Sequence, residues 1–211
     1  MKPRALAHPE NGAVHPDDTR ARLLKAAAEV FADNGYETST IRQICARAGA
    51  NVALVNYYFG DKLELYSEVL RSSMTPRRTP PAADPDQALR QIIRSMVERA
   101  FETGDQANLR YRLMLHELVH ATAATSRVVD VVMRPLYDRL REIVGAILEL
   151  PADHEKTRLC VHSVIGQIAH YAHSTPILTA LWPAMTMTPA QREAVAAHVA
   201  EFTLAYLRRR P

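Results

Sequence analysis

Proline and glycine divide the chain into segments in which apolar residues recur every three or four positions. This is the spacing of an amphipathic helix. The first segment, from about Asp17 to Asn34, places Leu24 and Phe31 on one face and meets Gly35 as its expected C-terminal stop. Only 7 of the 211 residues are glycine, while Ala, Leu, Arg and Glu are abundant. We therefore predict an all-α protein and exclude an all-β fold or a glycine-rich nucleotide-binding α/β fold.

Capping signals mark the starts of several further helices. They are Thr40-x-x-Gln43, Asn51, Asp84-Pro85 and Thr188-Pro189-x-Gln191. Gly49 should end the second helix, and Pro135 should kink or divide a helix that includes it. The remaining helices are expected near 52–58, 62–72, 86–102, 107–121, 126–149, 154–173, 176–182 and 189–208.

The proline-rich stretch between Ser72 and Pro85 cannot continue a helix and indicates a domain boundary. We expect a disordered tail over 1–15, an N-terminal three-helix helix-turn-helix domain over 16–72, the loop over 73–85, and a C-terminal helical ligand-binding and dimerisation bundle over 86–211.

Cysteine usage and hydropathy indicate the cytoplasm. Cys45 and Cys160 are far apart, and the stretch from Met1 to His15 lacks the apolar core of a signal peptide. Residues 159–191 contain no Asp, Glu, Lys or Arg, but histidines and prolines occur among them too often for a membrane span. We expect a cytoplasmic protein with no membrane partner.

Two short helices joined at Gly49 have the layout of a helix-turn-helix, whose second helix enters the DNA major groove. Residues 1–72 are neutral overall, but residues 38–62 carry Arg42, Arg47 and Lys62 against Asp61, a net charge of +2. An anion-binding surface is expected there. From spacing alone, plain helix packing remains an alternative.

Several motifs carry a family resemblance. The runs 19–27, 31–36, 40–44, 48–49 and 57–66 resemble the DNA-binding domain of the TetR-family transcriptional regulators over about residues 17–70. The runs 134–136 and 181–183 are similar to the YbiH-like (CecR-like) subgroup. The resemblance implies a homodimeric repressor that binds a palindromic operator in double-stranded DNA and is released by an apolar or amphipathic small molecule.

The candidate DNA-binding residues follow from this resemblance and from the chemistry of base and phosphate recognition. Arg42 suits guanine or phosphate, Asn56 suits adenine, and the methyl groups of Val52 and Ala53 suit thymine. Tyr57 is open between packing and phosphate contact, and the third helix lacks a lysine that the family commonly has there. The full set is Thr19, Arg42, Asn51, Val52, Ala53, Asn56, Tyr57, Tyr58 and Lys62.

Seven of the nine histidines follow residue 110. We expect some of them to line an effector pocket, with the candidates Met114, His116, His120, His162, Gln167, His170 and Tyr171. Satisfied core or surface histidines are the alternative for each residue. The i, i+4 pair His116 and His120 could chelate a metal, but no Cys cluster or His-Glu-x-x-His accompanies it, so we expect neither metal nor cofactor.

The predicted dimer interface pairs the helices near 154–173 and 189–208. Its residues are Val164, Ile168, Val195, Val199, Phe202 and Tyr206. The alternative is that the last four only close the core of the monomer.

Two other functions remain open. One is a helical small-molecule-binding or interaction protein without sequence-specific DNA binding, because residues 51–56 are unusual for the family and the domain is neutral. The other is a metal-dependent helical enzyme. Enzyme activity is not expected, since Cys160 and His162 lie two positions apart on different helix faces and no other nucleophile motif occurs.

Overall fold

The computed structural model describes residues 16–74, 84–119 and 122–209. All regular structure in these ranges is helical, which confirms the all-α prediction. The expected tail over 1–15, most of the expected loop (75–83) and His120 lie outside the described residues. No helix among the described residues is long and apolar enough to cross a membrane.

The chain forms two compact units. The first comprises residues up to Val69 together with Arg112–Ala124, and the second comprises Leu70–Tyr111 together with the chain from Thr125 onward. The expected single boundary in the proline-rich loop therefore needs one correction, since residues 112–124 group with the N-terminal unit.

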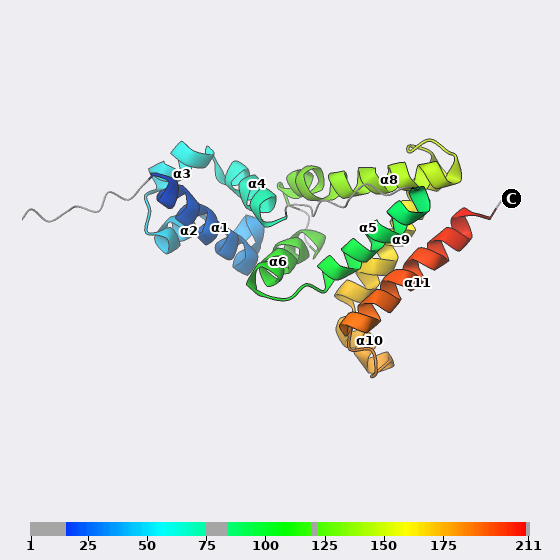
Figure 1. Cartoon of the computed structure of the whole chain (residues 1–211). Helices are drawn as coiled ribbons and strands as arrows, with labels where there is room; N and C mark the ends of the chain where they lie inside the picture. The colour runs from blue at the N-terminus through cyan, green and yellow to red at the C-terminus, as the bar shows by residue number, and fades with distance from the viewer. Residues whose placement is uncertain (1–15, 75–83, 120–121, 210–211) are drawn as a thin grey trace, which may run out of the picture. The chain divides into compact units, whose positions relative to one another are not determined.

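The first unit contains four helices from the start of the chain and the second half of a fifth (Figure 1). They are α1 (Pro16–Thr38), α2 (Ile41–Ala48), α3 (Val52–Phe59), α4 (Lys62–Ser73, as far as Val69) and α6 (Asp105–Val119, from Arg112). Phe31 and Tyr66 form the centre of its core, with ring centroids 4.8 Å apart in an edge-to-face arrangement. Leu23, Ile44 and Val55 are also fully buried, so α1, α2, α3 and α4 share one apolar core.

Gly35 breaks the first helix as predicted, but a helical turn follows it, so that α1 runs to Thr38. Its backbone has φ 79° and ψ 172°, a combination that is accessible essentially only to glycine. The Ser39 hydroxyl donates to the Gly35 carbonyl at 2.6 Å and fixes the turn that leads into α2.

The second unit is a helical bundle. Its helices are α5 (Pro85–Ala100), the first part of α6, α7 (Thr125–Val128), η1 (Val129–Met133), α8 (Arg134–Leu148), α9 (Glu155–His173), α10 (Thr175–Leu181) and α11 (Pro189–Leu207). Side chains from α5, α8, α9 and α11 form its core, among them Leu89, Leu140, Val161 and Leu204.

Helices α5 and α11 are antiparallel and are joined by three ion pairs. These pairs are Asp86 with Arg208, Arg90 with Glu201, and Arg94 with Glu193. Exposed ion pairs contribute little individually, so the apolar core supplies most of the stability of this contact.

The predicted interruption at Pro135 is present as a π-helical segment. Val129–Met133 forms a π-helix, and α8 begins directly after it with Pro135 in its first turn. Proline has no amide hydrogen, so an α-helix cannot continue through this position with all its hydrogen bonds. The expected single helix over 126–149 is therefore divided into α7, η1 and α8.

Candidate nucleic-acid interface

Helix α2 is fixed at both ends by local hydrogen bonds. The Thr40 hydroxyl accepts from the Gln43 amide at 3.2 Å, and the Gln43 side chain accepts from the Thr40 amide at 2.8 Å. These bonds confirm the predicted capping box. At the other end Gly49 has φ 61° and ψ 43°, the left-handed conformation in which a glycine commonly ends a helix. The turn before α3 is therefore specified by the sequence.

Helix α3 begins at Asn51, whose side-chain oxygen accepts from the Ala53 amide at 3.0 Å. Its inner face carries Val55 and Phe59, both buried. With its start capped and its inner face in the core, the helix holds its outer face in a fixed orientation.

The outer face of α3 carries four of the predicted DNA-binding residues. Val52, Ala53, Asn56 and Tyr57 are all exposed, and Tyr57 exposes 79% of its surface. Their spacing of i, i+1, i+4 and i+5 places them on one side of the helix. This face offers methyl groups, an amide that can donate and accept, and a phenol hydroxyl, which are groups that contact base edges and phosphates.

Tyr58 is half-buried beside this face, and its ring packs edge-on against that of Tyr57 at 5.0 Å between centroids. Asn51 is exposed, but its side-chain oxygen already accepts the capping hydrogen bond from the Ala53 amide. Its side-chain NH₂ group can still donate hydrogen bonds to a ligand.

The two arginines of α2 differ in availability. Arg42 is exposed, and no hydrogen bond or ion pair joins it to any residue in the described part of the chain. Arg47 instead contacts Glu29 at 2.7 Å and Asp33 at 3.3 Å. Arg42 is therefore the guanidinium of α2 that is available to DNA.

Lys62 and Thr19 are less accessible than the sequence analysis expected. The Lys62 ammonium donates to the Glu37 carbonyl at 3.3 Å and lies 4.4 Å from the centroid of the Tyr36 ring. Burial lowers the pKa of Lys62, while the charge of Glu37 acts in the opposite direction. Thr19 is 9% exposed, and its hydroxyl accepts from Arg22 at 3.4 Å.

The second half of α6 packs against α1 and α4, a contact that was not predicted from the sequence. Arg112 pairs with Asp33 and lowers the pKa of that carboxyl, and Nε2 of His116 lies 3.1 Å from the Ala32 carbonyl. The Tyr66 hydroxyl donates to the buried Glu117 carboxylate at 3.3 Å, and burial raises the pKa of Tyr66.

The predicted effector residues do not share one unit. Met114 and His116 belong to the first unit, where His116 packs against α1, so its assignment to a pocket of the C-terminal domain is corrected. The other described candidates, all on α9 in the second unit, are His162, Gln167, His170 and Tyr171. Among them His162 and His170 are exposed, and the Gln167 amide donates to the Ser163 carbonyl at 3.2 Å.

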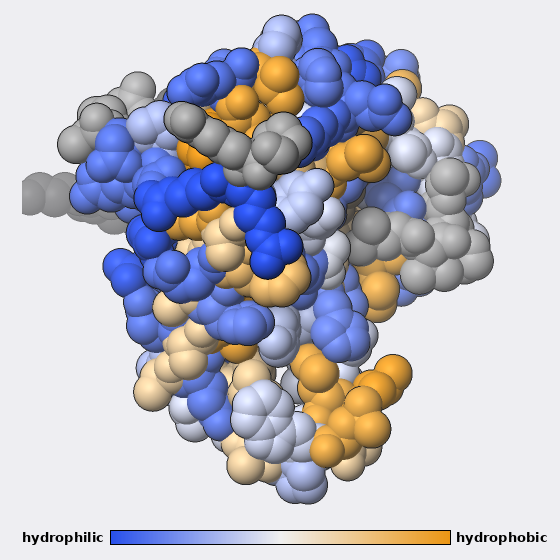
Figure 2. Space-filling model, turned by 90° about the vertical axis from the view of Figure 1, so that its right-hand side faces the viewer, coloured by the Kyte–Doolittle hydropathy of each residue, from blue (hydrophilic) through white to orange (hydrophobic). Residues whose placement is uncertain are grey.

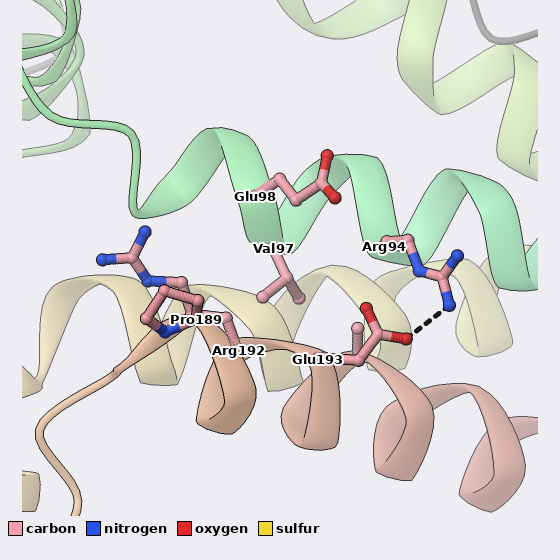
Figure 3. Close-up of a pocket in the computed structure, with 7 residues that line it drawn as sticks. Arg94, Val97, Glu98, Pro189, Arg192 and Glu193 are labelled. Carbon is pink, nitrogen blue, oxygen red and sulfur yellow. Dashed lines mark hydrogen bonds and ion pairs between the residues drawn. The ribbon is translucent and has the colours of Figure 1, made fainter.

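A small cleft lies between α5 and α11 (Figure 3). Its volume is about 170 Å³, and its lining includes Arg94, Arg192, Glu98 and Glu193. Arg192 is directed away from Arg94, donates to the Met187 carbonyl at 2.7 Å and covers the Phe101 ring. The cleft is smaller than the roughly 300 to 1,000 Å³ of a drug-sized ligand site and contains none of the predicted effector residues.

The predicted dimer residues divide into two groups. Val164, Ile168, Val195 and Val199 are buried in the core of their own chain, where a partner cannot reach them, so their assignment to the interface is corrected. Phe202 and Tyr206 remain exposed on α11. Leu159 on α9, which was not among the predicted residues, is exposed to a similar extent.

Comparisons with known proteins agree with this architecture. Residues 23–69 match the bacterial regulatory proteins of the tetR family, and residues 85–208 match the C-terminal domain of the HTH-type transcriptional dual regulator CecR. The chain is 28% identical to the CecR protein of Shigella flexneri over 187 residues, which cover 80% of this chain and 82% of that protein. A shorter match of 83 residues, 36% of this chain and 39% of the relative, is 37% identical to the transcriptional repressor NicS of Pseudomonas putida.

Solved structures share the fold. A HlyIIR mutant protein superposes with a TM-score of 0.62 at 20% identity, covering 88% of this chain and 97% of that one. The regulator FadR of Bacillus subtilis, crystallised with stearoyl-CoA, gives 0.59 at 17% identity, covering 88% and 98%. The chain belongs to the TetR family of DNA-binding transcriptional regulators and has a C-terminal domain of the CecR type.

Proposed function

We propose that this regulator is a homodimeric repressor that binds a palindromic operator through the outer face of α3 and through Arg42. The observation that supports this most strongly is the exposure of Val52, Ala53, Asn56 and Tyr57 on one side of a helix whose inner side is fixed in the core. In this arrangement Asn56 pairs with adenine and Arg42 contacts guanine or phosphate.

Two copies are needed for tight binding. The first 72 residues carry nine Lys or Arg and nine Asp or Glu, so one copy gains little from the release of counterions on binding DNA. A two-fold dimer doubles the contacts and places its recognition helices about 34 to 36 Å apart, in successive major grooves. Exposed apolar side chains on α9 and α11 provide a surface for this dimer.

An apolar or amphipathic small molecule bound to the C-terminal unit is proposed to release the operator. Helices α4 and α6 each contribute residues to both units, so a change in the second unit reaches the first through the chain itself. A coupling free energy of about 1 to 3 kcal/mol would lower operator affinity by about 5- to 150-fold. The stearoyl-CoA in the FadR structure shows a ligand of this chemistry on a related fold.

Selection of bound sequences from random duplex DNA tests the DNA-binding part of the proposal. The expected product is an inverted repeat whose half-sites are one helical turn apart, with an affinity that falls steeply as salt is raised. The absence of enrichment at low salt would refute the proposal and favour a ligand-binding protein without sequence-specific DNA binding.

Small-molecule release is tested on the selected duplex. Fatty acids and acyl-CoA thioesters are added to the protein–DNA complex, and the expected result is a rise in the dissociation constant with at least one of them. If neither class lowers operator affinity, this part of the proposal is refuted while the DNA-binding part stands.

A further inference from the structure

An exposed apolar patch lies on α10 and just after it. Ile177, Leu181 and Trp182 expose 56–79% of their surfaces, and we name them the tip patch. Their spacing of i, i+4 and i+5 gathers them on one side of the short helix. Figure 2 shows an apolar surface at the lower edge of the view, the level at which Figure 1 draws α10.

The tip patch is held in a fixed position. The segment that follows it buries Met185 and Met187 in the core of the second unit. The Gln191 side chain donates to the Ala184 carbonyl at 2.6 Å and accepts from the Thr188 amide at 3.0 Å. A fixed apolar surface loses little conformational freedom on binding, which favours association.

A second exposed apolar group lies toward the opposite end of the α9 and α11 pair. Leu159, Phe202 and Tyr206 expose 53–61% of their surfaces, and we name them the end patch. Lys156 of α9 lies 5.9 Å from the centroid of the Tyr206 ring, so the start of α9 is beside the end of α11. From Leu159 to the last residue of α9 is roughly 21 Å along the helix axis.

The area of the end patch is too small for a dimer on its own. A standard interface buries about 800 Å² per partner, of which about 60% is apolar. At about 150 to 250 Å² for each large side chain, the end patch exposes roughly 350 Å². The tip patch adds roughly 400 Å² on the same scale, and the two patches together exceed the apolar area that a standard interface buries on each partner.

Two-fold symmetry brings these two patches together. An axis perpendicular to α9 reverses the direction of α9 in the partner, so the tip patch of one copy lies over the end patch of the other, and the contact occurs twice. Between the patches, α9 exposes Ser163 and Gly166. A Cβ atom added at Gly166 would meet no atom within 4 Å, so there is room for a partner helix to approach.

We propose that the tip patch of one protomer docks on the end patch of a second copy of this chain, so that α10 is part of the dimer interface. This rests on the proposed homodimer and specifies which surfaces form it. It also explains why Phe202 and Tyr206 are exposed on a helix whose other large apolar residues, Val195, Val199, Leu204 and Leu207, are buried.

Sedimentation of the full chain tests the contribution of the tip patch. The double variant Leu181→Ser/Trp182→Ser is expected to raise the dimer dissociation constant at least tenfold, because buried aromatic and aliphatic anchors dominate interfaces. The matched control is Thr179→Ser, which changes an exposed residue on the other side of α10. An unchanged dissociation constant in the double variant overturns the inference.

Disulfide crosslinking tests the register. Differently tagged copies carrying Leu181→Cys and Phe202→Cys are co-expressed and oxidised, and the expected product is a linked pair of the two variants. Crosslinking of Leu181→Cys with itself, or no crosslink in a dimeric protein, overturns the inference and leaves the proposed homodimer intact. A wild-type chain that sediments as a monomer refutes the proposed homodimer, and the inference falls with it. The native Cys45 and Cys160 are buried and free, and wild-type protein is the control for them.

Discussion

Replacing Gly35 by alanine probes the contact between α1 and the second half of α6. The backbone of Gly35 lies in a region that costs about 1 to 3 kcal/mol for a residue with a side chain. A Cβ atom at this position would also lie 3.0 Å from Nδ1 and 3.2 Å from Cγ of His116. Overpacking of this kind costs typically about 1 to 3 kcal/mol, so we expect Gly35→Ala to lose about 2 to 6 kcal/mol in total.

A double-mutant cycle separates the two costs. Amide hydrogen exchange of α1 and α2 in the full chain measures the free energy of opening for wild type, Gly35→Ala, His116→Ala and the double variant. We expect Gly35→Ala to cost at least about 1 kcal/mol less when His116 is already alanine, because only the backbone cost then remains. Equal costs in the two backgrounds would refute the packing of His116 against Gly35.

Gly49→Ala is the matched control for backbone strain. Its φ is also positive, but a Cβ atom added there would meet no atom within 4 Å. The variant should lose only the cost of the left-handed conformation, about 1 to 2 kcal/mol, and this loss should not depend on His116.

Three further predictions concern single side chains. Arg42→Ala should weaken operator binding at least tenfold in a fluorescence titration with no loss of stability, whereas Arg47→Ala, whose native side chain is already paired, should affect binding less; equal effects would contradict the assignment. Asn51→Ala should destabilise the first unit by about 0.5 to 2 kcal/mol in hydrogen exchange, and Asn51→Ser should retain most of the wild-type stability because serine can also cap the helix. Equal losses in the two variants would contradict the capping role. Arg112 lowers the pKa of Asp33, so this pair stabilises the folded state above the ordinary Asp pKa of 3.8, and the contribution is lost as the pH falls below that value. Arg112→Ala should therefore weaken the dependence of the unfolding free energy on pH at the acid end. An unchanged dependence would contradict the pair.

Local signals in the sequence predicted most helix boundaries. The caps at Thr40, Asn51, Asp84 and Thr188 are hydrogen bonds between residues two or three positions apart, so the residue types alone specify them. The exposure of Asn56 and Tyr57 also follows from the helical period once Val55 and Phe59 face the core.

Contacts between distant residues were not predictable in this way. The pairing of Arg112 with Asp33 and the contact of His116 with Ala32 join positions about 80 residues apart, and neither has a local sequence signature. His116 was therefore predicted to line an effector pocket, whereas in the structure it packs α6 against α1.

Periodicity also cannot tell the core of a chain from an interface with a partner. Val195, Val199, Phe202 and Tyr206 form one predicted stripe on α11, yet the first two are buried in their own chain and the last two are exposed. Deciding between the two roles requires the position of α5 and α9 beside α11, which only the folded structure supplies.

Whether the outer face of α3 reads DNA sequence is measured by selection from random duplexes with the wild-type chain and with Asn56→Ala in parallel. We expect the variant to lose the preference for adenine at one position in each half-site, symmetrically, and to keep the preference at the other positions. An identical sequence profile for the two proteins would contradict the claim that Asn56 and the outer face of α3 contact the bases.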